Sequence, residues 1–327
     1  MTAARQRRWV PGRPVDLGAT VSTLVRGDPS HRFAADGSFW RATRTPSGPG
    51  VLRVVVDAAA GDVVGTAWGD GAQWLLAGLP DLLGAADTTA ECFQPKAEHW
   101  RLVAAWRARA HWRVPRSRAV FEALSMAVLE QVVTGGEARQ SIRTLIRRFG
   151  EPAPGPQPPG PPPRGQRGGS GAWSGLVLPP TPAQWAAIPS WEWLRAGVEQ
   201  RRNATVIRAA RVANRLEATL DRDPQDAERL LRSLPGVGRW TAAEVRQRAH
   251  GDPDAFSFDD FHVARNVSWA LTGEVLDDDG CAQVIDCYAG HRYRVQRLLE
   301  LAGVARPRRG PRMTLPTHTP IASGGRS

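Results

Sequence analysis

The chain has 327 residues, of which 42% are hydrophobic, so it is long enough for two domains with buried cores. No apolar run approaches the roughly 18 residues of a membrane-spanning helix, and the basic N-terminus lacks the apolar core of a secretory signal. Three cysteines are too few for a disulfide framework or a metal-binding quartet, and a reducing cytoplasm is expected. Because 43 basic residues face 32 acidic ones, the charge of +11 predicts a polyanionic partner, first of all nucleic acid.

Residues 1–14 are rich in arginine and proline and are expected to form a loose basic arm. Residues 15–96 are expected to form a small antiparallel α+β domain. Runs of apolar, aromatic and β-branched residues predict three strands, and apolar residues at helical spacing predict a helix that packs on them. The strands are placed at 38–45, 51–56 and 62–68, the turn between the last two at Ala60-Gly61-Asp62, and the helix at 73–83.

From residue 97 to 304 the apolar residues recur at helical spacing, which predicts an all-helical domain. The tryptophans at helical spacing, such as Trp100, Trp106, Trp185 and Trp191, are expected in its core. A Pro/Gly run at 151–171 has almost no apolar side chains and is expected to be a disordered insertion. The polar, basic residues 305–327 are expected to be a disordered tail.

One short segment joins two of the predicted helices and has an unusual sequence, Leu234-Pro235-Gly236-Val237-Gly238. Proline stops the first helix and the glycines permit a tight turn. Val237 is expected to pack between the two helices. The backbone N–H groups at the start of the second helix form an anion site that suits a DNA phosphate.

A second segment, Ala255 to Val267, contains the pattern Asp-x-His-Val-x-Arg, which begins at Asp260, 20 residues after Trp240. A lone aspartate at a helix start is usually an N-cap. Here its neighbour Asp259 is the candidate cap, which leaves Asp260 open for another role.

Together these segments resemble the helix-hairpin-helix DNA glycosylases that carry a Gly/Pro-rich loop and an aspartate, in particular the bacterial inducible 3-methyladenine (alkylpurine) DNA glycosylases. The resemblance extends from about His99 to Ala302. It implies an α+β fold, with a small N-terminal antiparallel sheet domain followed by an all-α helix-hairpin-helix domain. It also implies a monomeric enzyme that flips a damaged base out of duplex DNA, excises it, and leaves the abasic site to downstream repair enzymes near the nucleoid.

The resemblance assigns the chemistry to Asp260, which would stabilise positive charge on the deoxyribose and orient the attacking water. Lyase relatives carry a lysine where Trp240 stands, and the only lysine of this chain, Lys96, lies outside both segments. An enzyme without lyase activity is therefore expected. No redox cofactor or catalytic metal is implied, although backbone carbonyls of Arg232, Leu234 and Val237 are candidate ligands for Na⁺ or K⁺ bridging to phosphate.

The expected base pocket combines aromatic rings, from Trp240 and Phe261, with two carboxylates at positions that are aromatic in close relatives, Glu244 and Glu300. Rings stack on a cationic methylated purine, and carboxylates accept hydrogen bonds from a base. The competing interpretation pairs Glu244 with Arg248, and Glu300 with Arg297, on a solvated helix face.

The remaining expected contacts are to the DNA itself. Gln131 and Val132 correspond to the segment that inserts where the base leaves; alternatively, Val132 is a core residue and Gln131 a surface residue. His262 and His291 are expected to be structural or to face phosphate. The other residues expected to contact DNA are Gly236, Val237, Gly238, Arg239 and Thr241.

Three functions stay open from the sequence. The leading one is a glycosylase for alkylated purines; the second, made plausible by Glu244 and Glu300, is a glycosylase for oxidised or deaminated bases. The third is a non-catalytic damage-binding protein, against which Asp260 argues. Residues 1–14 and 305–327 contain nine arginines and no acidic residue, so flexible ends are expected to add salt-sensitive DNA affinity.

Overall fold

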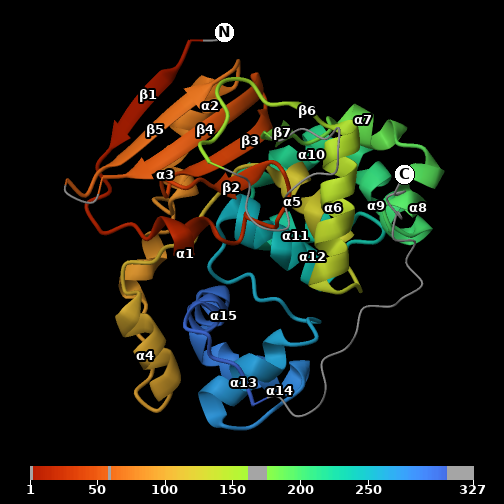
Figure 1. Cartoon of the computed structure of the whole chain (residues 1–327). Coiled ribbons are helices and arrows are strands. Elements are labelled where there is room, and N and C mark those ends of the chain that lie inside the picture. Colours follow the sequence, from red (N-terminus) through yellow and green to blue (C-terminus); the bar gives the residue numbers. More distant parts are fainter. Residues whose placement is uncertain (1–2, 58–59, 161–174, 308–327) are drawn as a thin grey trace, which may run out of the picture.

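The chain, seen in a computed structural model that describes residues 3–57, 60–160 and 175–307, forms a sheet domain and two helical lobes (Figure 1). In that view the sheet domain lies at the upper left with the first lobe beside it, and the second lobe lies below them. Within the described ranges, none of the helices combines the length and apolar character needed to cross a bilayer.

The sheet domain is built on five antiparallel strands in the order β1-β5-β4-β3-β2. Its strands are β1 (Arg5–Trp9), β2 (His31–Phe33), β3 (Phe39–Thr45), β4 (Gly48–Val56) and β5 (Val63–Trp68), and its helices α1 (Leu17–Val21), α2 (Ala72–Ala77) and α3 (Leu79–Leu82). Alternate residues such as Phe39, Leu52 and Val54 are buried under these helices. The three predicted strands are confirmed, whereas the predicted helix is two helices separated at Gly78.

The N-terminal arm is not loose, which corrects the expectation for residues 5–13. Residues 5–9 form the edge strand β1, paired with β5. Arg5 donates to Gln73, Arg7 to the carbonyl of Leu76 and Arg13 to the carbonyl of Leu83, while Arg8 pairs with Asp62. These four arginines are therefore held on the sheet domain, and a basic edge strand also resists pairing with other chains.

Lobe 1 contains α5 to α12 and surrounds one continuous core that includes Leu124, Leu129, Ile142, Trp185 and Trp193. Its elements are α5 (Val120–Leu129), α6 (Gly135–Phe149), α7 (Pro182–Ala187), α8 (Ser190–Arg195), α9 (Gln200–Arg211), α10 (Ala213–Glu217), the 3₁₀ turn η2 (Ala218–Asp221), α11 (Pro224–Arg232), α12 (Arg239–Val245) and the π-helical turn η3 (Arg246–His250).

Lobe 2 has a separate core, with Leu102, Tyr293 and Leu298 among its members, and takes helices from both sides of lobe 1 in the sequence. Its elements are η1 (Thr88–Cys92), α4 (Trp100–Ala108), α13 (Val263–Thr272), α14 (Asp278–Ile285), η4 (Asp286–Tyr288) and α15 (Arg292–Leu301). The predicted helical domain is thus two lobes, and the chain crosses between them twice.

Two of the tryptophans expected in the core lie on the surface instead: Trp100 is 63% exposed and Trp191 64% exposed. In α4 the buried face is formed by Leu102 and Ala105, so Trp100 faces outward, with the guanidinium of Arg101 4.3 Å from its ring centroid. Helical spacing fixes which residues share a face but does not say which face is buried.

The Pro/Gly run is ordered over its first ten residues, contrary to the expectation for 151–160. Glu151–Pro152 (β6) pairs with Val177–Leu178 (β7), and Ala153 is buried. The Arg32 guanidinium donates to the carbonyl of Pro158 at 2.7 Å, which ties this run to the sheet domain. Residues 161–174 of the expected insertion, and 308–327 of the expected tail, lie outside the described residues.

Candidate active site

The turn between α11 and α12 is shaped by one glycine that no other residue can replace. Gly236 has φ +96°, and a Cβ built on it would lie 2.2 Å from Oγ1 of Thr205, so both backbone conformation and space require glycine. Val237 is 6% exposed and belongs to the lobe 1 core. This confirms that it packs between the two helices, with Gly238 and Arg239 exposed at the start of α12.

The loop after α5 lies against this turn. The side-chain amide of Gln131 donates to the carbonyl of Gly236 at 2.9 Å and to Oγ1 of Thr241 at 2.7 Å. Val132, the next residue, is 100% exposed and has φ +54°, a strained conformation for a β-branched side chain. The core interpretation of Val132 is wrong, and Gln131 is fixed to the hairpin rather than pointing freely from the surface.

Asp260 is held by local contacts at both of its oxygens. Oδ1 accepts the backbone N–H of His262 at 2.8 Å and that of Val263 at 3.1 Å, at the start of α13. Oδ2 accepts the indole N–H of Trp240 at 3.2 Å. Asp260 therefore makes the N-terminal capping bonds that the sequence analysis gave to Asp259, and it still lines a cavity.

Asp259 adopts φ +67° and donates its backbone N–H to Oδ2 of Asp278 at 3.3 Å. A non-glycine residue in this conformation costs free energy, and such strain often accompanies functional sites. Here it turns the chain immediately before Asp260, so that the following carboxylate reaches both α13 and Trp240.

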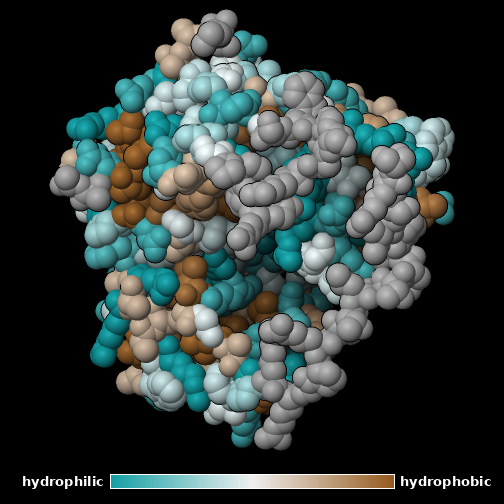
Figure 2. All heavy atoms as spheres, viewed as in Figure 1, coloured by the Kyte–Doolittle hydropathy of each residue, from teal (hydrophilic) through white to brown (hydrophobic). Residues whose placement is uncertain are grey.

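The cavity beside Asp260 has a volume of about 420 Å³ and lies where the two lobes and segment 22–27 of the sheet domain meet. Figure 2 shows a hollow in the middle of the face it displays, bordered largely by hydrophilic residues. The charged residues that line the cavity are four arginines and four carboxylates: Arg26, Arg139, Arg248, Arg297, Glu130, Glu244, Asp260 and Glu300.

Glu244 is the centre of a buried charge cluster. Its Oε2 lies 2.6 Å from Nη1 of Arg248 and 3.7 Å from Nη2 of Arg26, and its Oε1 accepts the hydroxyl of Ser257 at 2.9 Å. Arg26 also pairs with Glu130. The predicted pair of Glu244 with Arg248 exists, but it is buried inside the cavity wall instead of lying on a solvated face.

The cluster shifts the proton affinities of its members. Burial alone would raise the pKa of Glu244, but Arg248 and Arg26 outweigh it and hold that pKa below its ordinary value. Burial, together with the charge of Arg248, lowers the pKa of Arg26 to about 9. Both groups are therefore charged near neutral pH, and each depends on the other for compensation.

Glu300 stands at the rim of the same cavity. It accepts the Gln296 amide at 3.0 Å and pairs with Arg297 at 2.9 Å. Arg297 also donates to the hydroxyl of Ser22 at 2.6 Å, which joins lobe 2 to the sheet domain. Both earlier interpretations of Glu300 hold in part, because it is exposed and paired yet lines the cavity.

The two aromatic residues expected in the base pocket lie elsewhere. Phe261 is 70% exposed, with its ring 4.8 Å from that of His262 and 5.0 Å from the guanidinium of Arg265. It precedes α13 on the outer side of the turn that directs Asp260 inward. Trp240 contacts Asp260 instead, and Tyr293 is the only aromatic residue that lines the cavity among those described.

The histidines have different surroundings. His262 is exposed at the start of α13. His291 lies 5.2 Å from the ring of Phe93 and accepts from Arg294 at 3.2 Å, which is a structural setting within lobe 2.

Sequence reasoning missed the wall that the sheet domain supplies, residues 22–27, and the polar residues Glu130, Gln247 and Gln296. Gln247 donates to Oγ of Ser257 at 2.8 Å, and Gln296 does so at 3.2 Å. The spacing of Glu244 and Arg248 was the one local signal for this cluster. The other members come from distant parts of the chain.

The hairpin carbonyls proposed as cation ligands are only partly free. The carbonyl of Leu234 accepts the N–H of Val237 at 3.0 Å inside the turn. It keeps a second lone pair, so the donor set of Arg232, Leu234 and Val237 remains compatible with Na⁺ or K⁺.

No protein-family model matches the chain, and no curated protein matches it in sequence. Solved structures match it closely in fold. A 3-methyladenine DNA glycosylase from Archaeoglobus fulgidus superposes with a TM-score of 0.68 at 18% identity, over 90% of this chain and 97% of that one. The apo 8-oxoguanine glycosylase/lyase of Clostridium acetobutylicum gives 0.63 at 12% identity, over 92% and 98%.

The same Clostridium acetobutylicum enzyme bound to double-stranded DNA gives a TM-score of 0.60 at 12% identity, over 87% of this chain and 90% of that one. The architecture of a sheet domain followed by helical lobes is therefore the fold of these DNA glycosylases, over nearly the full length of each chain.

Proposed function

We propose that the chain is a DNA glycosylase of base excision repair, which flips a damaged base out of duplex DNA and hydrolyses its N-glycosidic bond. The observation that carries the proposal is Asp260, a carboxylate at the edge of a polar cavity with both oxygens held in place. A damage-binding protein would not require a carboxylate fixed beside the sugar.

The proposed reaction needs little beyond this carboxylate and water. The C1′–N bond breaks with its electron pair moving to the base, while a water oxygen forms a new bond to C1′. A neutral base takes up one water proton as it leaves, whereas a cationic base leaves as a neutral molecule and that proton passes to solvent. In both cases the products are the free base and an abasic sugar. Asp260 stabilises the positive charge that develops on the sugar and orients the water.

The enzyme is proposed to lack lyase activity. Trp240 occupies the hairpin position at which lyase relatives carry lysine, and its indole N–H is engaged with Asp260. An indole cannot form the Schiff base that strand cleavage requires. The sole lysine, Lys96, lies near α4 and is absent from the residues that line the cavity.

The DNA-facing parts lie close together. The N–H groups in the first turn of α12 have no carbonyl partner within the helix and suit a phosphate, and Arg239 is exposed beside them. Val132, fully exposed on the adjoining loop, is proposed to fill the space that the flipped base leaves. His262 is exposed at the other side of Asp260 and suits a backbone contact.

Two lesion classes compete. Alkylated purine is the candidate that the sequence resemblance favours, and the neighbour from Archaeoglobus fulgidus is named for 3-methyladenine. An oxidised or deaminated base is the second candidate, which the polar lining of the cavity favours, because Phe261 and Trp240 do not line it. In either case the enzyme is proposed to act as a monomer near the nucleoid, and to hand the abasic site to downstream repair enzymes.

Base release from defined duplexes tests the proposal. We expect the purified chain to release a base and leave alkali-labile sites, and Asp260→Asn to slow release by about a thousandfold with duplex affinity retained. Asp259→Asn is the matched control, since it removes the adjacent exposed carboxylate and asparagine tolerates positive φ; its activity should stay near normal. Loss of activity in the control but not in Asp260→Asn would refute the assignment.

Borohydride trapping tests the proposed absence of lyase activity. No covalent protein–DNA adduct and no strand cleavage before alkali treatment are expected. A trapped adduct would show lyase activity. Binding of damaged duplexes without release of any base would establish the non-catalytic alternative.

A further inference from the structure

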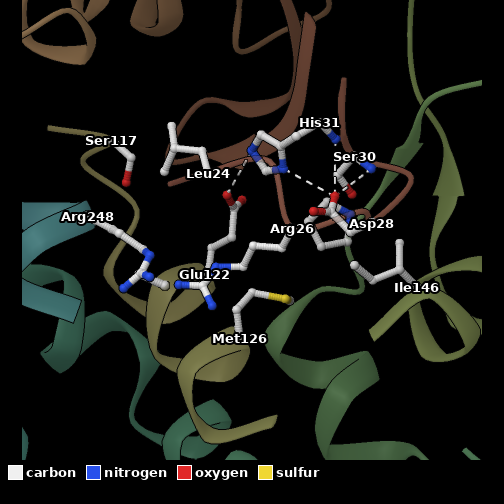
Figure 3. Close-up of a pocket in the computed structure, with 12 residues that line it drawn as sticks. Leu24, Arg26, Asp28, Ser30, His31, Ser117, Glu122, Met126, Ile146 and Arg248 are labelled. Carbon is white, nitrogen blue, oxygen red and sulfur yellow. Dashed lines mark hydrogen bonds and ion pairs between the residues drawn. The ribbon is translucent and has the colours of Figure 1, made fainter. Parts of the chain in front are cut away.

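Arg26 is a residue of the sheet domain whose side chain forms part of the cavity wall. It belongs to segment 22–27, yet its guanidinium lies between Glu130 and Glu244 of lobe 1. Figure 3 looks into a smaller pocket that Arg26 also lines, and it shows the side chain of Arg26 running past Met126 toward Arg248. The side chain is only 9% exposed, so this arginine is part of the cavity wall and not of the outer surface.

The loop that carries Arg26 is rigidly anchored two residues later. Oδ1 of Asp28 accepts the backbone N–H groups of Ser30, at 2.8 Å, and His31, at 3.1 Å. The same oxygen lies 3.2 Å from Nδ1 of His31, whose Nε2 faces Glu122 of lobe 1 at 3.6 Å. These contacts, drawn in Figure 3, fix the position of Arg26 relative to lobe 1.

Polar atoms without a hydrogen-bond partner gather at this cavity. Among the described residues, buried side-chain atoms lacking such a partner include Nη2 of Arg26 and Oη of Tyr293. Both residues line the cavity, and Tyr293 is 1% exposed. Thr23 Oγ1 and Arg297 Nε complete the group. A buried polar atom that lacks a hydrogen bond costs about 1–3 kcal/mol, and Nη2 of Arg26 has only the charge of Glu244 beside it, at 3.7 Å. This group of atoms therefore favours a ligand that supplies the missing hydrogen bonds.

The charged residues that line the cavity indicate which class of base would fit it. Four arginines and four carboxylates balance, so the lining does not form a negative site for a cationic alkylpurine. It offers guanidinium donors beside carboxylate acceptors, and Glu244 lies 3.7 Å from Arg26. A carbonyl next to a ring N–H, which chemists call a lactam edge, presents the complementary acceptor and donor.

The leaving group supports the same conclusion. A cationic methylated base departs neutral and needs no help, whereas a neutral base accumulates negative charge as the C1′–N bond breaks. Arginine donors near its carbonyl stabilise that charge in the transition state. On the basis of the proposed glycosylase function, we infer that Arg26 donates to the carbonyl of a flipped, neutral base with a lactam edge, and that this residue sets the lesion specificity.

Competing duplexes test the inference on the full chain. Each carries one lesion: hypoxanthine, uracil or 8-oxoguanine, which have a lactam edge, or 3-methyladenine, which has none and is cationic. The wild-type chain should release at least one lactam base with a kcat/KM at least tenfold above that for 3-methyladenine. The three lactam duplexes distinguish deaminated from oxidised bases, and deaminated bases are mispaired and so cost less to flip.

Two Arg26 variants separate recognition from folding. Arg26→Gln should lower the ratio of kcat/KM for the lactam base to that for 3-methyladenine by about tenfold or more. Arg26→Lys keeps the charge between Glu130 and Glu244 but loses the planar fork, so it should fold and still lose selectivity. Arg53→Gln, which breaks an exposed pair with Asp36 in the same domain, is the control and should change neither rate.

The outcomes are distinguishable. Preferred release of 3-methyladenine, or an unchanged selectivity ratio in Arg26→Lys, would overturn the inference while leaving the glycosylase function intact. Release of no base from any duplex would overturn the proposed function itself.

Discussion

The two sides of the cavity are built in different ways. The side that would face the sugar comes from one stretch of chain, residues 234–260, which holds the hairpin, Trp240 and Asp260. Within this stretch Trp240 donates to Asp260, and the next residues donate backbone N–H groups to the same carboxylate. The side that would face the base is assembled from Arg26, Glu244 and Arg297, which belong to three separate parts of the fold. In the proposed enzyme, the residues for the chemistry would therefore come from one short stretch of sequence, and those for selectivity from several distant stretches.

The largest predicted effect is a loss of unfolding free energy when a charge is removed from the side of the cavity that would face the base. Glu244→Ala leaves Arg248 buried without its carboxylate and leaves Arg26 with Glu130 alone, which should cost about 3–5 kcal/mol of unfolding free energy. Urea denaturation measures it, and Asp226→Ala, which removes an exposed pair with Arg229, should leave the midpoint unchanged. Since the pKa of Glu244 is lowered in the folded state, its contribution is present above its ordinary pKa near 4.5 and lost at lower pH as the folded-state pKa is passed. A small loss in Glu244→Ala would mean that the charges are not coupled.

The next largest effect should come from the hairpin. Gly236→Ala places a Cβ 2.2 Å from Thr205 and forces positive φ on alanine, which should cost about 2 kcal/mol. Gly238→Ala is the matched control for stability, because a Cβ there meets nothing within 4 Å. Equal unfolding free energies for the two variants would contradict the close contact. Duplex affinity of Gly236→Ala should fall as well.

One side of the cavity comes from a single stretch of chain and the other from three distant parts of the fold. This difference explains which features could be predicted from the sequence. The hairpin turn and the burial of Val237 were predicted correctly, because each depends on a short pattern with its own local structure. The three central strands were found for the same reason. The catalytic role of Asp260 stays a proposal. The place of Arg26 in the cavity wall could not be predicted from the sequence. Its neighbours in sequence do not indicate that it lies between Glu130 and Glu244 in the fold.

The errors in the prediction have the same origin. The arginine-rich arm looked unstructured, yet its backbone completes the sheet beside β5, and strand pairing of this kind depends on a distant partner. Phe261 was assigned to the pocket because the resemblance implies aromatic rings there. In the structure Asp260 lines the cavity and Phe261 is 70% exposed, so the resemblance did not fix the direction of this side chain.

A smaller effect is expected when only the hydrogen bond from Trp240 to the Asp260 carboxylate is removed. Trp240→Phe keeps an aromatic ring and removes the indole N–H that donates to Asp260. Loss of one hydrogen bond to a charged group is worth about 1.5 kcal/mol, so single-turnover base release should slow by roughly tenfold. Abasic-site binding should be unchanged. A rate equal to that of the wild type would show that the capping bonds to Oδ1 alone position Asp260.

The smallest effect is expected at Val132, where one substitution should change the unfolding free energy and base release in opposite directions. Val132→Gly relieves the positive φ and should raise the unfolding free energy by about 1 kcal/mol. The same change removes the side chain that would fill the duplex, so base release should fall. Val275→Ala, at another exposed valine, should alter neither quantity. A fall in both quantities would contradict strain at Val132.

The amide of Gln131 bridges two loops that are 105 residues apart in sequence, one carrying Val132 and the other the turn that is proposed to face phosphate. Their separation is therefore set when the chain folds, before DNA is present. A binding surface fixed in this way loses little conformational entropy on association. In the proposed complex with DNA, the two loops would keep a constant distance between the backbone contact and the point of base extrusion.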